Sequence, residues 1–119
     1  MDDLAAHWNI DRSQSCFTYA SGLLSGYPQA RLLALSSPYD FNWWTEPIDF
    51  IFEDSSHANP QLRDNLDFWV PLVKSGGIIA GHDYAASHWP DVAVEAHSLR
   101  DQLGAELNVQ GSVWWLIKP

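Results

Sequence analysis

The stretch IDFIFEDSSH, residues 48–57, carries the strongest structural signal in the chain. Four of its first five residues are isoleucine or phenylalanine, and β-branched and aromatic residues of this kind favour a strand. The strand should stop at the acidic pair Glu53-Asp54. A second stretch, GGIIAGHDY at residues 76–84, has the same form, because apolar residues 78–80 lead directly into a polar turn. The sequence therefore predicts two buried strands that each end in titratable side chains.

A helix is predicted between these two strands. Asn59 can cap its start, and Pro60 suits its first turn. An apolar stripe then follows at helical spacing, formed by Leu62, Leu66, Trp69, Val70 and Val73. Pro71 should distort the last turn, and Gly76-Gly77 should end the helix.

The remaining segments continue the alternation of strands and helices. Apolar spacing and turn residues predict helices over 15–27 and 90–103, and strands over 31–35, 106–109 and 113–117. The last two strands are joined by a tight turn and should form an antiparallel hairpin. We therefore expect an α/β fold with a mostly parallel, helix-covered sheet that closes in a C-terminal antiparallel hairpin.

Composition limits the classes of function. The 119 residues suit one domain, residues 1–119, and 46% of them are hydrophobic, which excludes a disordered tail. Fifteen acidic residues against 6 basic ones give a net charge of −9, which disfavours nucleic acids and anionic membranes as partners.

The expected location of the protein follows from two further features. Cys16 is the single cysteine, so no internal disulfide can form, which fits a reducing compartment. No apolar run approaches the roughly 18 to 20 residues needed to span a bilayer. We expect a soluble, cytoplasmic protein.

Titratable side chains gather where the two central strands end. Asp54 and His57 follow the first strand, and His82 and Asp83 follow the second. Ligands of open parallel sheets bind beyond the carboxyl ends of the strands, and neighbouring strands lie only about 4.8 Å apart. Such a cluster could hold a divalent metal, supply a histidine base, or bind a cofactor ammonium group. The alternative is that the carboxylates cap turns and the histidines pack against loops.

These motifs resemble the class I S-adenosylmethionine-dependent methyltransferases. The resemblance rests on residues 48–57, on the run WVPLVKSGGII at 69–79 and on GHDY at 81–84, and it extends over roughly residues 31–119. The most similar group contains macrocin-type O-methyltransferases and cephalosporin-hydroxylase-like proteins. The resemblance implies a Rossmann-like sheet and methyl transfer to a small hydroxylated acceptor.

The resemblance also implies roles for individual residues. Asp54 and Ser55 would bind the cofactor, and Ser37 falls where relatives carry an acid that contacts the adenine. His57 and His82 would be catalytic. A divalent metal such as magnesium would be held by Asp54, His82 and Asp83.

One element of the family pattern is missing from this sequence. No Gly-rich loop after an apolar strand precedes Arg31, so the resemblance implies a sheet without its first strands and without that loop. Catalysis would then require another chain to supply the missing segments. Two other hypotheses stay open: a non-catalytic Rossmann-like module that self-associates through an exposed sheet edge at residues 31–35, and a metal-binding protein or metal-dependent hydrolase.

Overall fold

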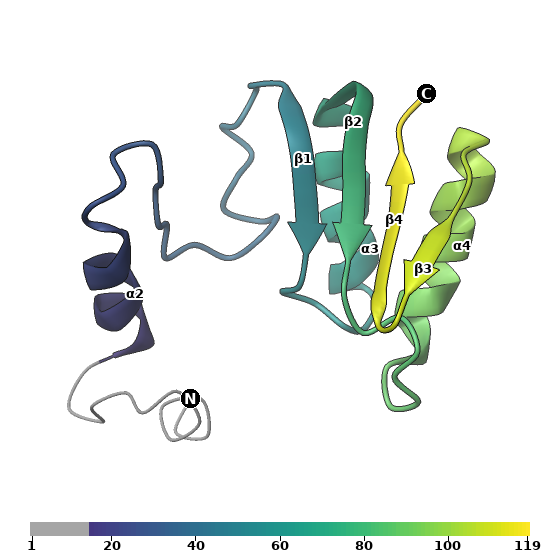
Figure 1. Cartoon of the computed structure of the whole chain (residues 1–119), viewed down its shortest axis with the longest axis horizontal. Coiled ribbons are helices and arrows are strands. Elements are labelled where there is room, and N and C mark those ends of the chain that lie inside the picture. The colour runs from purple at the N-terminus through teal and green to yellow at the C-terminus, as the bar shows by residue number, and fades with distance from the viewer. Residues whose placement is uncertain (1–14) are drawn as a thin grey trace. The chain divides into compact units, whose positions relative to one another are not determined.

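The computed structural model describes residues 15–119, and the chain separates into two compact units, Met1–Leu35 and Ser36–Pro119 (Figure 1). In the first unit, helix α2 spans Cys16–Leu24. The Ser15 hydroxyl accepts a hydrogen bond from the Thr18 backbone N–H at 3.1 Å, which caps the first turn. The predicted helix over 15–27 is thus confirmed, three residues shorter at its C-terminal end.

The predicted strand over residues 31–35 is wrong. These residues form no regular element, and Leu32, Leu33 and Leu35 are exposed. A strand needs a neighbour to pair its backbone N–H and C=O groups, and residues 15–35 contain no other strand. A local apolar run was therefore not enough to make a strand here.

The second unit contains a four-stranded sheet in the order β1-β2-β4-β3. The strands are β1 at Ile48–Glu53, β2 at Val73–Gly81, β3 at Asn108–Gln110 and β4 at Val113–Ile117. Only β1 and β2 are parallel, whereas β4 pairs antiparallel with both β2 and β3. The expectation of a mostly parallel sheet is corrected to a mixed one, because residues 31–35 add no parallel strand and the confirmed hairpin supplies two antiparallel pairings.

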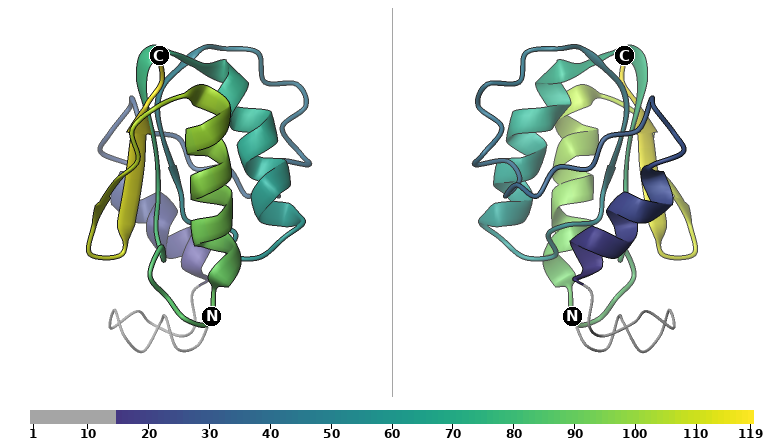
Figure 2. Two further views of the ribbon diagram at one scale, coloured as in Figure 1. Left: turned by 90° about the vertical axis from the view of Figure 1, so that its right-hand side faces the viewer. Right: turned by 90° about the vertical axis from the view of Figure 1, so that its left-hand side faces the viewer.

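Helices α3 and α4 cover one face of this sheet (Figure 2). Helix α3 spans Gln61–Trp69 and α4 spans Pro90–Leu103. The N-cap residue of α3 is Pro60, one residue after the predicted Asn59, but the Asn59 Oδ1 still accepts from the Arg63 backbone N–H in the first turn at 3.0 Å. Gly104 ends α4 in the left-handed conformation.

The segment after α3 differs from the prediction in one respect. Pro71 tightens the chain into the 3₁₀ turn η1, Val70–Leu72, as expected. The Gly-Gly pair does not end the helix, because strand β2 has already begun at Val73 and contains both glycines. A Cβ atom on Gly77 would lie 2.6 Å from Cγ1 of Val73, so glycine lets the irregular start of β2 lie close to its neighbours.

Apolar side chains between the sheet and the two helices form the core. Its most buried members are Leu62, Val73, Ile79, Val92, Ala96, Trp114 and Leu116. On β1, the exposed Phe50 and Phe52 alternate with Ile51, which packs against this core. Within Ser36–Pro119 the helices therefore cover one face of the sheet, and the other face keeps exposed apolar side chains.

A buried charge links the two helices. Glu95 of α4 is only 5% exposed, and its Oε1 accepts from Arg63 Nη2 at 2.7 Å and from Asn59 Nδ2 at 2.8 Å. Hydrogen bonding to Glu95 raises the pKa of the Arg63 guanidinium, which therefore stays protonated.

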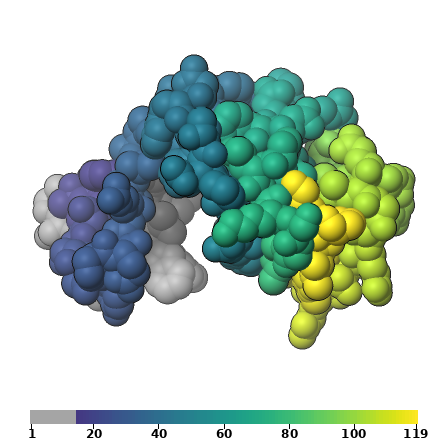
Figure 3. Space-filling model, turned by 90° about the horizontal axis from the view of Figure 1, so that it is seen from above, coloured from purple at the N-terminus to yellow at the C-terminus, as the bar shows by residue number. Residues whose placement is uncertain are grey.

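The C-terminal residues are held against the start of β2, beside which they lie in the space-filling view (Figure 3). Lys118 Nζ donates to the carbonyl oxygens of Val70 at 3.0 Å and Val73 at 2.7 Å, the first and the C-cap residue of η1. No helix among residues 15–119 has the length and apolarity to cross a membrane.

Candidate functional site

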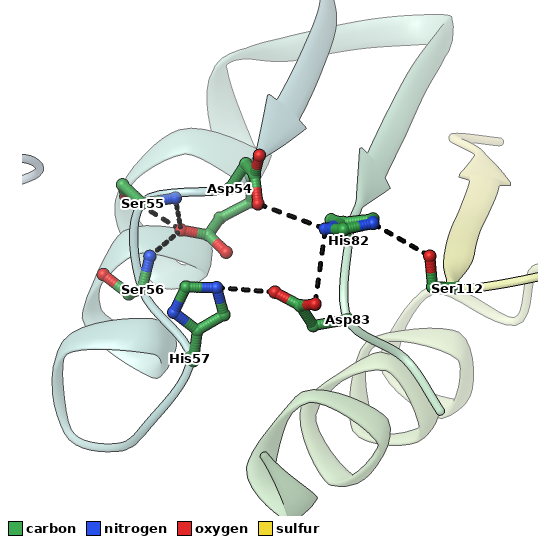
Figure 4. Close-up of polar contacts among 8 residues, drawn as sticks. Asp54, Ser55, Ser56, His57, His82, Asp83 and Ser112 are labelled. Carbon is green, nitrogen blue, oxygen red and sulfur yellow. Dashed lines mark hydrogen bonds and ion pairs between the residues drawn. The ribbon is translucent and has the colours of Figure 1, made fainter. Parts of the chain in front are cut away.

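The site lies at the edge of the sheet where β1 and β2 both end. Glu53 pairs with Gly81 in the parallel register, so the residues that follow each strand emerge side by side. Figure 4 shows Asp54 and His57 from the first loop facing His82 and Asp83 from the second. The predicted convergence of these four side chains is thus present in the structure.

His57 and Asp83 form the shortest contact among these four side chains. Nε2 of His57 lies 2.6 Å from Oδ2 of Asp83, and both side chains are half-buried. The His57 ring also stacks on Trp89, with ring centroids 4.7 Å apart. Asp83 has a φ of 63°, in the left-handed region that asparagine and aspartate tolerate better than most residues. A carboxylate and an aromatic ring therefore fix the orientation of this imidazole.

His82 is surrounded differently, although it neighbours Asp83 in the sequence. Its Nδ1 lies 3.5 Å from Oδ1 of Asp54 and 3.4 Å from Oδ1 of Asp83. Its Nε2 lies 2.8 Å from the hydroxyl of Ser112, which precedes β4 (Figure 4). Both ring nitrogens of His82 are thus engaged by protein groups.

Three of these side chains could bind one metal ion. Asp54, His57 and Asp83 each offer a ligand atom, and the three atoms lie within 4.8 Å of one another. Two carboxylate oxygens suit magnesium or manganese, and an added imidazole suits zinc, iron or manganese. The histidine in this group is His57, whereas His82 was predicted as the metal ligand from the sequence.

A hydrogen-bond network shapes the loop that carries Asp54. Oε1 of Glu53 accepts from the backbone N–H of Ser55 at 3.1 Å and of Ser56 at 2.9 Å. Asn65 of α3, only 1% exposed, donates to the hydroxyl groups of Ser55 and Ser56 and accepts from Ser37 Oγ at 2.6 Å. Sequence reasoning missed Asn65, yet a polar residue beside Leu66 on an apolar helix face was a visible signal.

A pocket of about 550 Å³ lies beside this loop. Trp44 and Trp69 contribute aromatic surface to it, with ring centroids 5.9 Å apart. Its lining includes Ser37, Asp54 and Ser55, the three residues predicted to bind a cofactor. The two hydroxyl groups among them also form hydrogen bonds within the protein. Ser37 bonds to Asn65 and to Trp69 Nε1, and Ser55 bonds to Glu53.

Comparison with known proteins gives one family. Residues 6–84 match the family model described as a methyltransferase domain, which is more than half of the chain. The match contains β1, α3, β2 and the four side chains of the site, and it ends before Ser112. A search of curated proteins found no match.

Proposed function

The chain belongs to the methyltransferase domain family, and from this premise we propose that it binds S-adenosylmethionine in the pocket beside Asp54 and transfers a methyl group to a small acceptor. The observation that carries the proposal is the coincidence of the pocket with Ser37, Asp54 and Ser55. Its volume falls in the range of small-molecule sites, about 300–1,000 Å³.

The chemistry of the lining fits this cofactor. Trp44 and Trp69 offer apolar faces for a flat ring, and the Asp54 carboxylate can accept a charge-assisted hydrogen bond from an ammonium group. When bound, S-adenosylmethionine supplies an electrophilic methyl group. The polar and the apolar parts of the cofactor would therefore each meet a matching part of the pocket.

We assign the role of general base to His57. Its Nε2 is held by Asp83, which leaves Nδ1 to take the proton of an acceptor hydroxyl as the new carbon–oxygen bond forms, the methyl–sulfur bond of the cofactor breaks and the neutral thioether leaves. His82 is less suited to accept this proton, because carboxylates face its Nδ1 and the Ser112 hydroxyl contacts its Nε2. The similarity of the motifs to macrocin-type O-methyltransferases supports a hydroxyl as the acceptor.

Isothermal titration with S-adenosylmethionine tests the cofactor assignment. Asp54→Asn should weaken binding about 10-fold or more, because one charge-assisted hydrogen bond is lost. Asp49→Asn is the matched control, since Asp49 lies on β1, the strand that leads into Asp54, is exposed and does not line the pocket. Absence of heat at millimolar cofactor, or equal weakening by both variants, would refute the assignment.

Methyl transfer from labelled S-adenosylmethionine to a panel of small hydroxylated acceptors tests the base. His57→Gln should lower the rate about 100-fold or more, the usual contribution of a positioned base. His88→Gln, at an exposed loop position, should leave the rate unchanged. An active His57→Gln protein would contradict the assignment.

We also propose a divalent metal, such as magnesium, between Asp54 and Asp83. Their carboxylates are hard oxygen ligands, and water would complete the coordination, so that His57 stays free to act as the base. A metal there would act as a Lewis acid on the acceptor oxygen. Magnesium titration of chelator-treated protein should show binding that Asp83→Asn removes and Asp49→Asn preserves, and an unchanged titration in Asp83→Asn would refute it.

A second candidate function is a module that associates with itself, and the edge of the sheet favours it. Within Ser36–Pro119, β1 pairs only with β2, and its Phe50 and Phe52, on the sheet face that α3 and α4 leave open, are 54% and 45% exposed. Apolar edge strands of this kind are normally covered. Light scattering should then show dimers that Phe50→Lys dissociates, and a monomer at high concentration would exclude this candidate.

A further inference from the structure

Ser112 connects the C-terminal hairpin to the site. It lies between β3 and β4, 30 residues from His82 in the sequence, and its Oγ is 2.8 Å from His82 Nε2. Its backbone carbonyl accepts a hydrogen bond from the Tyr84 N–H at 3.0 Å. The turn is therefore bound at two points to the segment that carries His82 and Asp83.

The surroundings of His82 determine where its proton lies. Two carboxylate oxygens, from Asp54 and Asp83, face Nδ1 at 3.5 and 3.4 Å, and their negative charges favour a proton on that nitrogen. A neutral imidazole with its proton on Nδ1 carries a lone pair on Nε2. The hydroxyl of Ser112 can donate to this lone pair, so the contacts on the two sides of the ring favour the same tautomer.

We propose that Ser112 is a positioning residue, which holds His82 as the Nδ1–H tautomer with that N–H directed at Asp54 and Asp83. His82 in turn fixes the two carboxylates that lie between it and His57. The catalytic consequence rests on the proposed function, whereas the tautomer itself does not. Ser112 lies beyond residues 6–84, the part of the chain that matches the methyltransferase family.

Long-range ¹H–¹⁵N correlation spectra of the ¹⁵N-labelled full chain test the proposal, at one fixed pH where His82 is neutral and in the presence of a chelator. In the unmodified protein His82 should be mainly the Nδ1–H tautomer. Ser112→Ala should lower the ratio of Nδ1–H to Nε2–H about fivefold, the effect of one lost hydrogen bond of about 1 kcal/mol. Ser112→Thr keeps the hydroxyl and should restore the ratio.

His97 provides a control within the same molecule. Its Nε2 lies 2.7 Å from the Tyr84 hydroxyl, so its tautomer should be the same in every variant at position 112. An Nε2–H tautomer of His82 in the unmodified protein would overturn the proposal even if Ser112→Ala did not fold. An unchanged ratio in a folded Ser112→Ala protein would overturn it as well.

Activity separates this proposal from the proposed function. Ser112→Ala should lower kcat for methyl transfer, with the Kd for S-adenosylmethionine unchanged, and Ser112→Thr should recover kcat. If the unmodified chain binds no S-adenosylmethionine while the tautomer ratio responds to Ser112→Ala, the proposed function fails and the positioning role stands. If the cofactor binds and the ratio does not respond, the positioning role fails alone.

Discussion

Gly81, the last residue of β2, cannot carry a side chain without displacing a buried tryptophan. A Cβ atom at this position would lie 2.5 Å from Nε1 of Trp114, and 2.7 Å from both Cε2 and Cζ2. Trp114 is only 1% exposed and pairs with Gly81 across the β2–β4 ladder. The Gly81→Ala substitution therefore tests whether the core and the end of β2 fit together as described.

The size of the effect follows from these distances. Carbon atoms in contact prefer a separation of about 3.5–4.0 Å, so the ring and the new methyl group must separate by about 1 Å. The ring is enclosed by the core, and the movement must be shared by the two paired strands. Overpacking of this kind costs about 1–3 kcal/mol, and three close ring atoms place Gly81→Ala at the upper end, about 3 kcal/mol. For a chain of this length, that corresponds to a fall in Tm of about 12 °C.

Urea denaturation of four proteins measures this energy as a double-mutant cycle. They are the unmodified chain, Gly81→Ala, Trp114→Leu and the double variant. Leucine lacks the indole edge, so Gly81→Ala should cost less than about 1 kcal/mol in the Trp114→Leu background, a coupling of about 2 kcal/mol.

Gly22→Ala is the matched control for this cycle. A Cβ there meets nothing within 4 Å, and alanine favours the helical conformation of α2. The control should cause no loss of stability. A Gly81→Ala protein as stable as the unmodified chain, or an equal cost with and without the indole, would refute the reasoning.

Three further predictions concern other parts of the structure. Asn65→Ala removes the buried amide of α3 that binds the site loop and should cost about 3 kcal/mol in urea denaturation, because it leaves the buried hydroxyl of Ser56 without its partner. A loss below about 1 kcal/mol would show that this network is dispensable. Lys118→Met keeps the aliphatic stem but loses the ammonium group bound to backbone carbonyls, and should lower the free energy of unfolding by about 1–2 kcal/mol, with Lys118→Arg closer to the unmodified protein. The hydrogen bond from Tyr39 to Asp64 raises the pKa of the Tyr39 phenol. This contact therefore stabilises the fold below the ordinary tyrosine pKa, and the stabilisation is lost as the pH rises through the raised value. In an ultraviolet titration Tyr39 should ionise above the ordinary tyrosine range, and Asp64→Asn should return it to that range.

Predictions that depended on local signals agree well with the structure. Helix α3 begins after Asn59, the chain tightens at Pro71, and β4 has the predicted bounds of 113–117. Each of these features follows from caps, prolines or side-chain periodicity within a few residues of itself. The strand predicted over residues 31–35 failed because a strand also needs a neighbour, which no local pattern supplies.

The same division holds within the site. That polar residues follow β1 and β2 was readable from the sequence, and parallel pairing of the two strands brings them together. Asn65, Trp89 and Ser112 were not predicted as parts of the site, because each reaches it from a separate element. Their contribution depends on how α3, α4 and the hairpin pack against the sheet.

The sequence by itself determined which elements form in Ser36–Pro119 and that β1 and β2 are each followed by a histidine and a carboxylate, because both properties are local. Only the tertiary structure decided that His57 meets Asp83 at 2.6 Å while His82 is held between two carboxylates and Ser112. Two histidines that look equivalent in the sequence thus receive different partners. The physical reason is that the environment of a ring nitrogen depends on which strands and turns lie beside it in space.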